Sequence, residues 1–337
     1  MVETAVREPT RVRSNSVVVL GALISLCVVA LMSIVVGSNQ LPLDAVWHAL
    51  FHYDGSYTDA VVRDARLPRT ILGICVGLAL GLAGALLQGA TRNPVADPGL
   101  LGVNYGAAVA IVFAGVLFGV QAPTALIWFS FCGALGGTVL VYLLGGSASP
   151  VRLILAGVAV QATFVGLNQA MQVIDTNSLD KMRYWLVGSL ANRDVPALAP
   201  LLPFLIIGVV LAITAARGLN AIALGDDTAR GLGATPGATR LRALLAVGLL
   251  CGTATAAAGP IAFVGLMIPH LVRMLVGQDH RWVLPLSALL GPVLVLGCDV
   301  LGRVLGSPGE LQVGIMTEIL GGLVFLFLVR RLWGVRR

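Results

Sequence analysis

Four histidines are the first candidates for catalysis or metal binding, because imidazole serves both as a base and as a ligand. His48 and His52 are four residues apart, which can place both on one face of a helix as metal ligands. The surrounding WHALFH contains no cysteine or carboxylate that would add a third ligand within that turn. We therefore interpret the segment as an amphipathic helix lying on the outer surface of a membrane, and predict no metal site.

No catalytic arrangement is visible among the other reactive residues. His270 follows Pro269 inside an apolar run and His280 lies in a basic loop, so both are interpreted as packing residues, and no Ser/His/Asp pattern is present. The five cysteines lie in apolar runs without a CxxC motif and are interpreted as small packing residues: Cys27, Cys75, Cys132, Cys251 and Cys298. The sequence thus predicts a chain that catalyses no bond chemistry.

ATP binding is excluded by the single lysine. A phosphate-binding P-loop needs a lysine preceded by glycine, whereas Lys181 follows Asp180, so the chain has no Walker A motif. If the protein works with ATP, another subunit must bind the nucleotide and its Mg²⁺. We expect no cofactor in this chain.

The composition indicates that these residues sit in a membrane protein. Of 337 residues, 57% are hydrophobic and 11% are charged, whereas soluble domains carry about 25% charged residues. The 41 glycines suit helices that approach closely in lipid. These values exclude a soluble enzyme, a disordered chain and a nucleic-acid-binding domain. The predicted fold class is all-α, a polytopic membrane protein.

Ten apolar runs are long enough to cross a membrane, since a spanning helix needs about 20 residues. The first run is too long for a signal peptide and lacks an A-x-A site, so we interpret it as a retained helix. Residues 1–16 are predicted to be a cytoplasmic N-terminal tail and 17–337 a single transmembrane domain. The predicted spans are 17–36, 67–88, 98–119, 123–144, 151–171, 198–215, 240–258, 260–277, 283–303 and 311–330.

The basic residues predict that both termini are cytoplasmic. With the N-terminus inside, 15 of the 22 lysines and arginines fall in cytoplasmic segments and 7 in outer ones. Three charged residues lie near membrane depth, where charge is costly. Asp299 and Arg303 are four residues apart and could pair on one helix face. Glu318 could line a pathway or be neutral within the bundle.

Five long motifs resemble one protein family. They are DARLPRT (64–70), GLALGLAGALLQGATRNPVADPGLLGVNYGA (77–107), LNAIALGDDTARGLGA (219–234), GPIAFVGLMIPHLVRMLVGQDHRWVLP (259–285) and PGELQVG (308–314). From about residue 40 to the C-terminus the chain is similar to FecCD-type permeases of ABC importers for iron–siderophore complexes, haem and cobalamin. Within that family, its motifs look most similar to the first permease subunit of ferric-enterobactin importers.

The resemblance implies the architecture of an ABC type II importer. Its permease subunits have ten helices each and form a pathway in pairs, so we expect a second, homologous permease subunit, most simply a different chain. Two cytoplasmic ATPases and an extracytoplasmic binding protein complete the machine. The family places the 216–239 loop against the ATPase, with Leu224, Gly225, Asp226, Asp227, Arg230 and Gly231 as candidate coupling residues. The alternative is an ordinary solvated loop.

The resemblance also implies sites at the outer end and in the pathway. Arg66, Arg69 and Arg303 fall where the family grips carboxylates of the binding protein. Interfacial anchoring, or pairing of Arg303 with Asp299 and of Arg66 with Asp64, is the alternative. Gate positions fall at Asn93, Val95, Ser147 and Ser149, although a Pro-terminated turn explains Asn93-Pro94 equally well. Segment 172–197 corresponds to the outer gate, or to an interfacial belt.

Two positions depart from the family pattern. Gln312 stands where the family usually has proline, so we expect the last span to bend differently at its start, and Glu318 stands where a small or hydroxyl residue is common. The function these features predict is import of a ferric siderophore, with a catecholate favoured, by alternating access. Haem or cobalamin as cargo stays open. An ion-driven secondary transporter and an intramembrane enzyme are the less favoured classes.

Overall fold

The computed structural model describes residues 15–37, 41–52, 54–146, 150–174, 185, 187–191, 193 and 195–334. All regular secondary structure in these residues is helical. Seven of the described helices are long and apolar enough to cross a membrane, and three shorter apolar helices accompany them. The predicted all-α fold with about ten spans is therefore confirmed. Of the predicted N-terminal tail, the structure describes only residues 15 and 16, which open the first helix.

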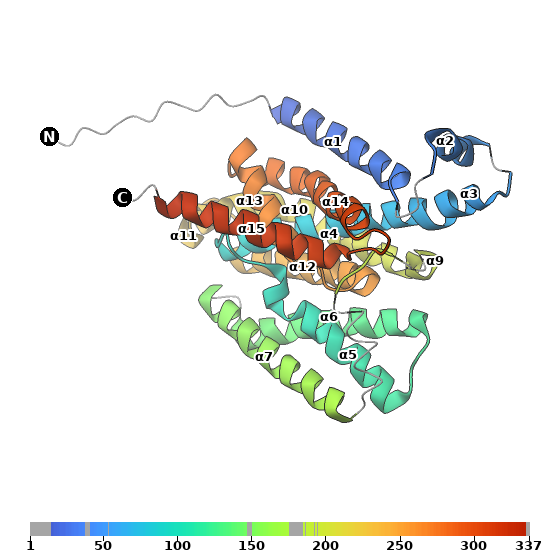
Figure 1. Ribbon diagram of the computed structural model, residues 1–337. Coiled ribbons are helices and arrows are strands. Elements are labelled where there is room, and N and C mark those ends of the chain that lie inside the picture. Colours follow the sequence, from blue (N-terminus) through green and yellow to red (C-terminus); the bar gives the residue numbers. More distant parts are fainter. Residues whose placement is uncertain are drawn as a thin grey trace.

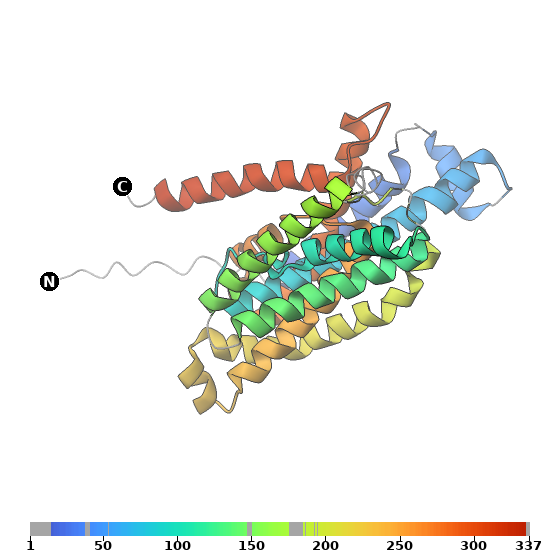
Figure 2. The ribbon, with the colours of Figure 1, turned by 90° about the horizontal axis from the view of Figure 1, so that it is seen from below.

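The ten long elements pack side by side, most of them running lengthwise through the molecule, as Figures 1 and 2 show. They are α1 (Asn15–Val35), α4 (Leu67–Thr91), α5 (Val103–Phe118), α6 (Pro123–Gly145), α7 (Pro150–Ile174), α10 (Leu202–Ala223), α12 (Pro236–Ala258), α13 (Val264–Val276), α14 (His280–Leu305) and α15 (Val313–Gly334). The shorter elements are α2 (Leu43–Phe51), α3 (Tyr57–Ala60), a π-helical turn (Val61–Arg66), α9 (Val195–Leu198), α11 (Asp226–Gly231) and 3₁₀ turns at Pro98–Leu101 and Ala199–Leu201.

Two of the predicted spans that begin late do so after a residue in the left-handed conformation. The span predicted at 98–119 opens with the 3₁₀ turn, and α5 starts only after Gly102, whose φ is +72°. The span predicted at 260–277 becomes helical at Val264, because Phe263 adopts a left-handed conformation with a φ of +66°. Hydropathy records only how apolar a segment is, so it cannot detect these breaks.

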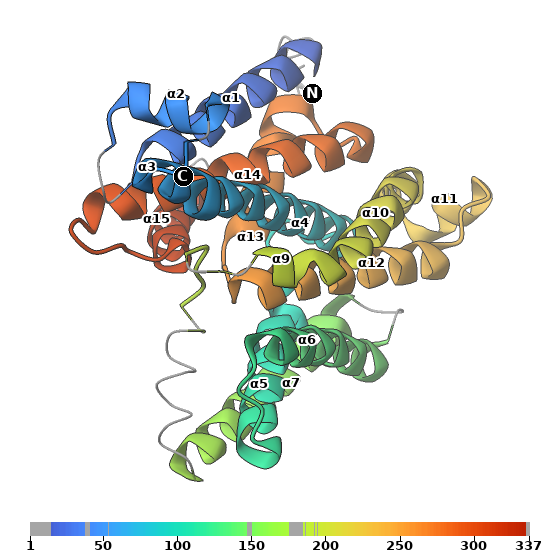
Figure 3. The same cartoon turned by 90° about the vertical axis from the view of Figure 1, so that its right-hand side faces the viewer.

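The two ends of the bundle carry different short elements. In Figure 1 the start of α1, the last turns of α15 and the short helix α11 lie at one end, whereas α2, α3 and α9 lie at the other. We call these the α11 end and the α2 end. Figure 3 shows α5, α6 and α7 as a group beside the remaining helices, with α4 in the middle of the larger group between α14 and α12.

Glycines allow α4 and α14 to touch backbone to backbone. A Cβ atom at Gly77 would lie 2.4 Å from the Pro292 nitrogen, and one at Gly81 would lie 2.2 Å from the Ser287 carbonyl oxygen. From the other side, a Cβ at Gly291 would lie 2.0 Å from the Gly77 carbonyl oxygen. Small residues are used in this way because helices in lipid associate by close packing rather than by a hydrophobic force.

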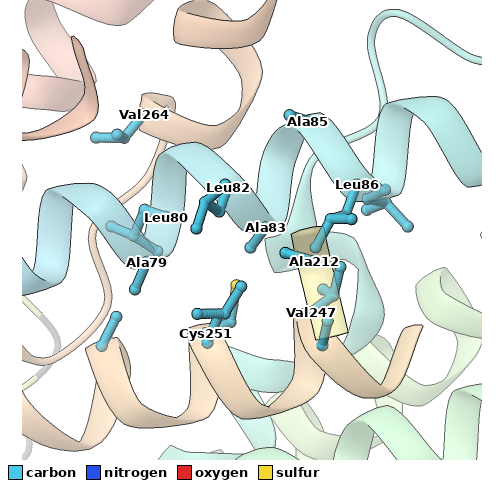
Figure 4. Packing of buried hydrophobic residues seen from close by; sticks show 14 of the residues in the cluster. Ala79, Leu80, Leu82, Ala83, Ala85, Leu86, Ala212, Val247, Cys251 and Val264 are labelled. Carbon is cyan, nitrogen blue, oxygen red and sulfur yellow. The ribbon is translucent and has the colours of Figure 1, made fainter. Parts of the chain in front are cut away.

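Small apolar side chains fill the opposite side of α4, as Figure 4 shows. Ala79 and Ala83 are fully buried beside Val247 and Cys251 of α12. The packing role predicted for the cysteines is confirmed for Cys251 and for Cys298, both buried. It is wrong for Cys27 and Cys132, which are exposed on the surface of this chain, while Cys75 is half-buried.

The close packing of α4 on α14 predicts a difference between two glycines of the same helix. Gly291→Ala should lower the melting temperature, because overpacking against a backbone atom costs about 1–3 kcal/mol. Gly297 meets no atom within 4 Å, so Gly297→Ala is the matched control and should leave stability unchanged or raise it slightly. Thermal unfolding of the purified protein in detergent, followed by tryptophan fluorescence, measures both. Equal melting temperatures for the two variants would contradict the packing described.

Candidate functional site

A network of charged residues joins three helices at the α2 end. Arg69, near the start of α4, grips the Asp299 carboxylate with two nitrogens, Nε at 3.0 Å from Oδ2 and Nη2 at 2.7 Å from Oδ1. Its Nη1 donates to Glu310 at 2.7 Å. Arg303 of α14 donates to the same Asp299 from Nη2 at 2.7 Å. One fully buried carboxylate therefore serves two arginines.

Arg303 and a third arginine, Arg66, bond to the last turn of α1. Arg303 Nη1 donates to the carbonyl oxygens of Ser33 at 2.8 Å and Val36 at 2.7 Å. Arg66 Nη1 donates to those of Ile34 at 2.9 Å and Val35 at 2.6 Å. The last carbonyls of a helix lack partners within the helix, and an unsatisfied carbonyl is costly in a membrane. The arginines supply the missing donors.

This geometry confirms that Arg303 pairs with Asp299, the simpler of the two interpretations given by the sequence. Arg303 is 2% exposed and Arg66 is 5% exposed, so both guanidinium groups lie inside this end of the chain. Arg69 and Glu310 are less enclosed. If this end is the outer one, as the sequence predicts, these arginines oppose the usual charge distribution of membrane proteins, and capping of α1 is a physical reason for them.

A cavity of about 330 Å³ opens beside this network. Glu310 and Asp64 share its wall with four arginines: Arg66, Arg69, Arg193 and Arg303. Arg193 also donates to the carbonyl oxygens of Ser189 and Ala258. The cavity thus combines a cationic wall with a few acidic groups, which suits it to receive a carboxylate.

At the α11 end, Asp226 fixes the short helix to the bundle. The Asp226 carboxylate accepts bonds from Arg240 Nη1 at 2.9 Å and Nη2 at 2.8 Å, and Arg92 Nη2 lies 3.4 Å from it. Arg240 Nε also donates to the carbonyl of Ala90, in the last turn of α4. The hydrogen bonds from Arg240 lower the pKa of Asp226 below its usual value, so this carboxyl is ionised at neutral pH.

The other candidate coupling residues face outward. Asp227 and Arg230 form an exposed ion pair of 2.7 Å, and Leu224 is 65% exposed. Gly225 has a φ of +106°, which an L side chain rarely adopts, and Gly231 faces open space. Leu232, which the sequence analysis did not select, is 67% exposed beside them. The structure thus separates one anchoring residue, Asp226, from an exposed surface of mixed apolar and charged character.

Buried polar residues that the sequence analysis missed connect α4 with the helices after α12. Gln88 donates to the carbonyl oxygens of Gly265 at 3.2 Å and Leu266 at 3.1 Å, at the start of α13, and accepts from Arg273. The signal in the sequence was an isolated glutamine in the apolar run GALLQGAT.

His280 is buried against Asn220, with 2.8 Å between the ring Nδ1 and the amide oxygen, so its predicted packing role is confirmed.

The candidate gate residues are only partly described. Asn93 follows α4 and accepts from the Val95 backbone nitrogen at 3.1 Å, a compact turn that leaves Val95 51% exposed. Ser147 and Ser149 lie outside the described residues, as does half of segment 172–197. Glu318, the sixth residue of α15, is exposed on the surface of this chain, as is Ile319 next to it.

Comparison with known proteins identifies what this arrangement resembles. The model of the FecCD transport family matches residues 25–331. The chain is 45% identical over 323 residues to the ferric enterobactin transport system permease protein FepD of Escherichia coli (strain K12), covering 94% of this chain and 96% of that protein. It is 36% identical over 320 residues to the hemin transport system permease protein HmuU of Yersinia pestis, covering 92% and 94%.

A solved structure agrees with this assignment. It is described as an inward-facing conformation of a metal-chelate type ABC transporter, with a TM-score of 0.81 at 30% identity over 94% of this chain and 99% of that one. The resemblance stated from the sequence motifs is therefore confirmed.

The network at the α2 end predicts that Asp299 is a strong determinant of stability. Asp299→Asn removes the charge shared by Arg69 and Arg303, and breaking a buried ion pair typically costs about 3–5 kcal/mol. Glu310→Gln is the control, because its side chain is 28% exposed and such pairs contribute about 1 kcal/mol or less. Thermal unfolding in detergent compares the two variants. If Asp299→Asn had the same melting temperature as the unmodified protein, the network would not hold these helices together.

Proposed function

The chain belongs to the FecCD transport family, and from this premise we propose that it imports a ferric siderophore, with a catecholate favoured, as one permease subunit of an ATP-driven importer. It is an integral membrane protein and, as a permease component, not the catalytic subunit of its transporter. We place it in the cytoplasmic membrane with both termini inside, supported by the excess of basic residues in the segments assigned to that side.

The choice of cargo depends on one observation, the 45% identity to the ferric enterobactin permease over nearly the full length of both chains. Haem is the second candidate, because the hemin permease is 36% identical over a similar length. Cobalamin is supported only by the family resemblance. Of the proposed pathway residues, the structure describes Asn93, Val95 and Glu318, and these do not separate the three ligands.

We propose that an extracytoplasmic binding protein docks at the α2 end. The support is the arginine-lined cavity, where a carboxylate of the binding protein could take the place of Glu310 on Arg69. Arg66 and Arg303 also line this cavity, although both are already bonded to the end of α1. In this proposal they shape and charge the site, while Arg69 makes the contact.

We propose that a cytoplasmic ATPase, which binds ATP and Mg²⁺, contacts the α11 end. Leu224 precedes α11 and Leu232 follows it, and both side chains are exposed. The exposed ion pair of Asp227 and Arg230 adds charge beside them. Apolar centres with polar rims are typical of protein interfaces. Since Asp226 clamps α11 to Arg240 at the start of α12, a force on this surface reaches the membrane helices directly.

A second permease subunit is proposed to cover α15. Glu318 lies about 8 Å along the axis from the start of that helix and is exposed in this chain. A carboxylate at this depth faces a cavity or a partner rather than lipid. The covering subunit would then place Glu318 at the subunit boundary or in the pathway, together with the turn at Asn93 and Val95 and with Ser147 and Ser149.

The proposed function predicts that a strain deleted for this chain loses uptake of a ⁵⁵Fe-labelled catecholate siderophore, and that the unmodified chain restores it. Parallel assays with labelled haem and cobalamin test the other cargoes. A strain whose partner ATPase carries a substitution of its P-loop lysine should fail to take up the same ligand, because the transport step requires ATP.

Two results would overturn the proposal at different levels. Unchanged catecholate uptake with lost haem or cobalamin uptake would contradict the cargo while retaining the machine. Uptake that survives in the ATPase-deficient strain but is abolished by collapsing the ion gradient would identify a secondary transporter instead.

A further inference from the structure

The corner between α2 and α3, at the α2 end of the molecule, gathers three possible metal ligands. One ligand atom each from His48, Asp54 and Asp59 lies within 4.8 Å of the others. His52 stacks on His48 with 5.5 Å between ring centroids. The segment WHALFH itself contains no third ligand within the helical turn of the histidines. The chain instead reverses after α2 and brings two carboxylates back to His48.

The turn that brings them together is tightly determined. Asp59 Oδ2 accepts from the backbone nitrogens of Asp54 at 2.8 Å and Gly55 at 3.0 Å. Gly55 has a φ of +75°, which glycine adopts without strain. Asp54 Oδ1 accepts from the Ser56 nitrogen at 3.0 Å, and Ser56 caps α3 by accepting from the Asp59 nitrogen. Both carboxylates are thereby oriented before any ligand arrives.

The second oxygen of Asp59 gives an independent indication of a ligand. Asp59 is 1% exposed, and within the described part of the chain its Oδ1 has no hydrogen-bond partner. A buried carboxylate oxygen without a partner is costly, and a second carboxylate close by adds repulsion. A bound cation would remove both penalties. Asp59 is thus buried, its Oδ1 is available to a ligand, and the imidazole of His48 lies close to it.

Packing holds the two sides of the corner at a fixed separation. Ala49, next to His48, and Val62, three residues after Asp59, are both fully buried in one small apolar cluster. Arg63 donates to the carbonyl oxygens of Ala49 at 2.6 Å and Leu50 at 3.0 Å, closing the end of α2. His48 and Asp59 therefore lie on packed helices, and the short turn between these helices carries Asp54.

We propose that His48, Asp54 and Asp59 bind a divalent cation of the zinc class. Zn²⁺ accepts mixed imidazole and carboxylate ligands and commonly has three protein ligands with water in the fourth position. Mg²⁺ and Ca²⁺ prefer sites made of oxygen alone, so the imidazole favours zinc over them. The ion would tie α2 to the turn that leads into α4. This site is separate from the arginine network and from the transported cargo, and it does not depend on the proposed function.

Equilibrium dialysis of the full-length protein against Zn²⁺ tests the site. The protein is purified in detergent without a histidine tag, stripped with chelator, and its bound zinc is measured by mass spectrometry. We expect one equivalent that is lost, or bound about tenfold or more weakly, in His48→Gln. His48 is exposed, so this variant should fold. His52→Gln is the matched control and should keep the equivalent, and Asp59→Asn should lose it.

Melting temperature supplies the second measurement. Zn²⁺ should raise it for the unmodified protein and for His52→Gln but not for His48→Gln, because a ligand that binds only the folded state stabilises it. Equal zinc binding by the unmodified protein and His48→Gln would assign the metal to the cysteines or to adventitious sites and overturn the proposal. Absence of bound zinc from the unmodified protein would overturn it as well.

Discussion

Contact between the backbones of α4 and α14 is the constraint on which the rest of the structure depends. A side chain at Gly77, Gly81 or Gly291 would overlap the opposite backbone, so the two helices form one unit. Lipid provides little hydrophobic force between helices, and close packing must replace it. Since α4 begins beside Asp299 and ends beside Asp226, this unit joins the polar networks at both ends of the molecule.

Most of the charged residues at those ends bond to other parts of this chain and so hold its helices in place. Arg303 and Arg66 satisfy the last carbonyls of α1, and Asp299 pairs with both Arg303 and Arg69. At the other end, Arg240 bridges Asp226 and the final turn of α4. The surfaces that we propose for partners are what remains accessible, namely the arginine-lined cavity and the outward face of α11. Arg69 takes part both in holding the helices and in a proposed surface, because it holds Asp299 and also lies in the wall of the cavity.

The sequence predicted the spans, the fold class and the family, because hydropathy and long motifs are local properties of the chain. It also predicted the pairing of Asp299 with Arg303, which are four residues apart on one helix. It could not give Arg69 its partners, because Asp299 is 230 and Glu310 is 241 residues away. Contacts over such distances leave no periodic trace in the chain. The breaks at Gly102 and Phe263 are changes of backbone conformation, which hydropathy does not record, and the return of Asp59 to His48 depends on the turn at Gly55.

The central claim is that this chain transmits the action of an ATPase from its exposed α11 surface to a binding protein at the opposite end. The most direct measurement is ATP hydrolysis by the reconstituted transporter, with and without ligand-loaded binding protein. The double variant Leu224→Ser/Leu232→Ser should abolish the stimulation, whereas Leu43→Ser, on exposed α2 at the other end, should retain it. Full stimulation in the double variant, with normal assembly, would contradict the account.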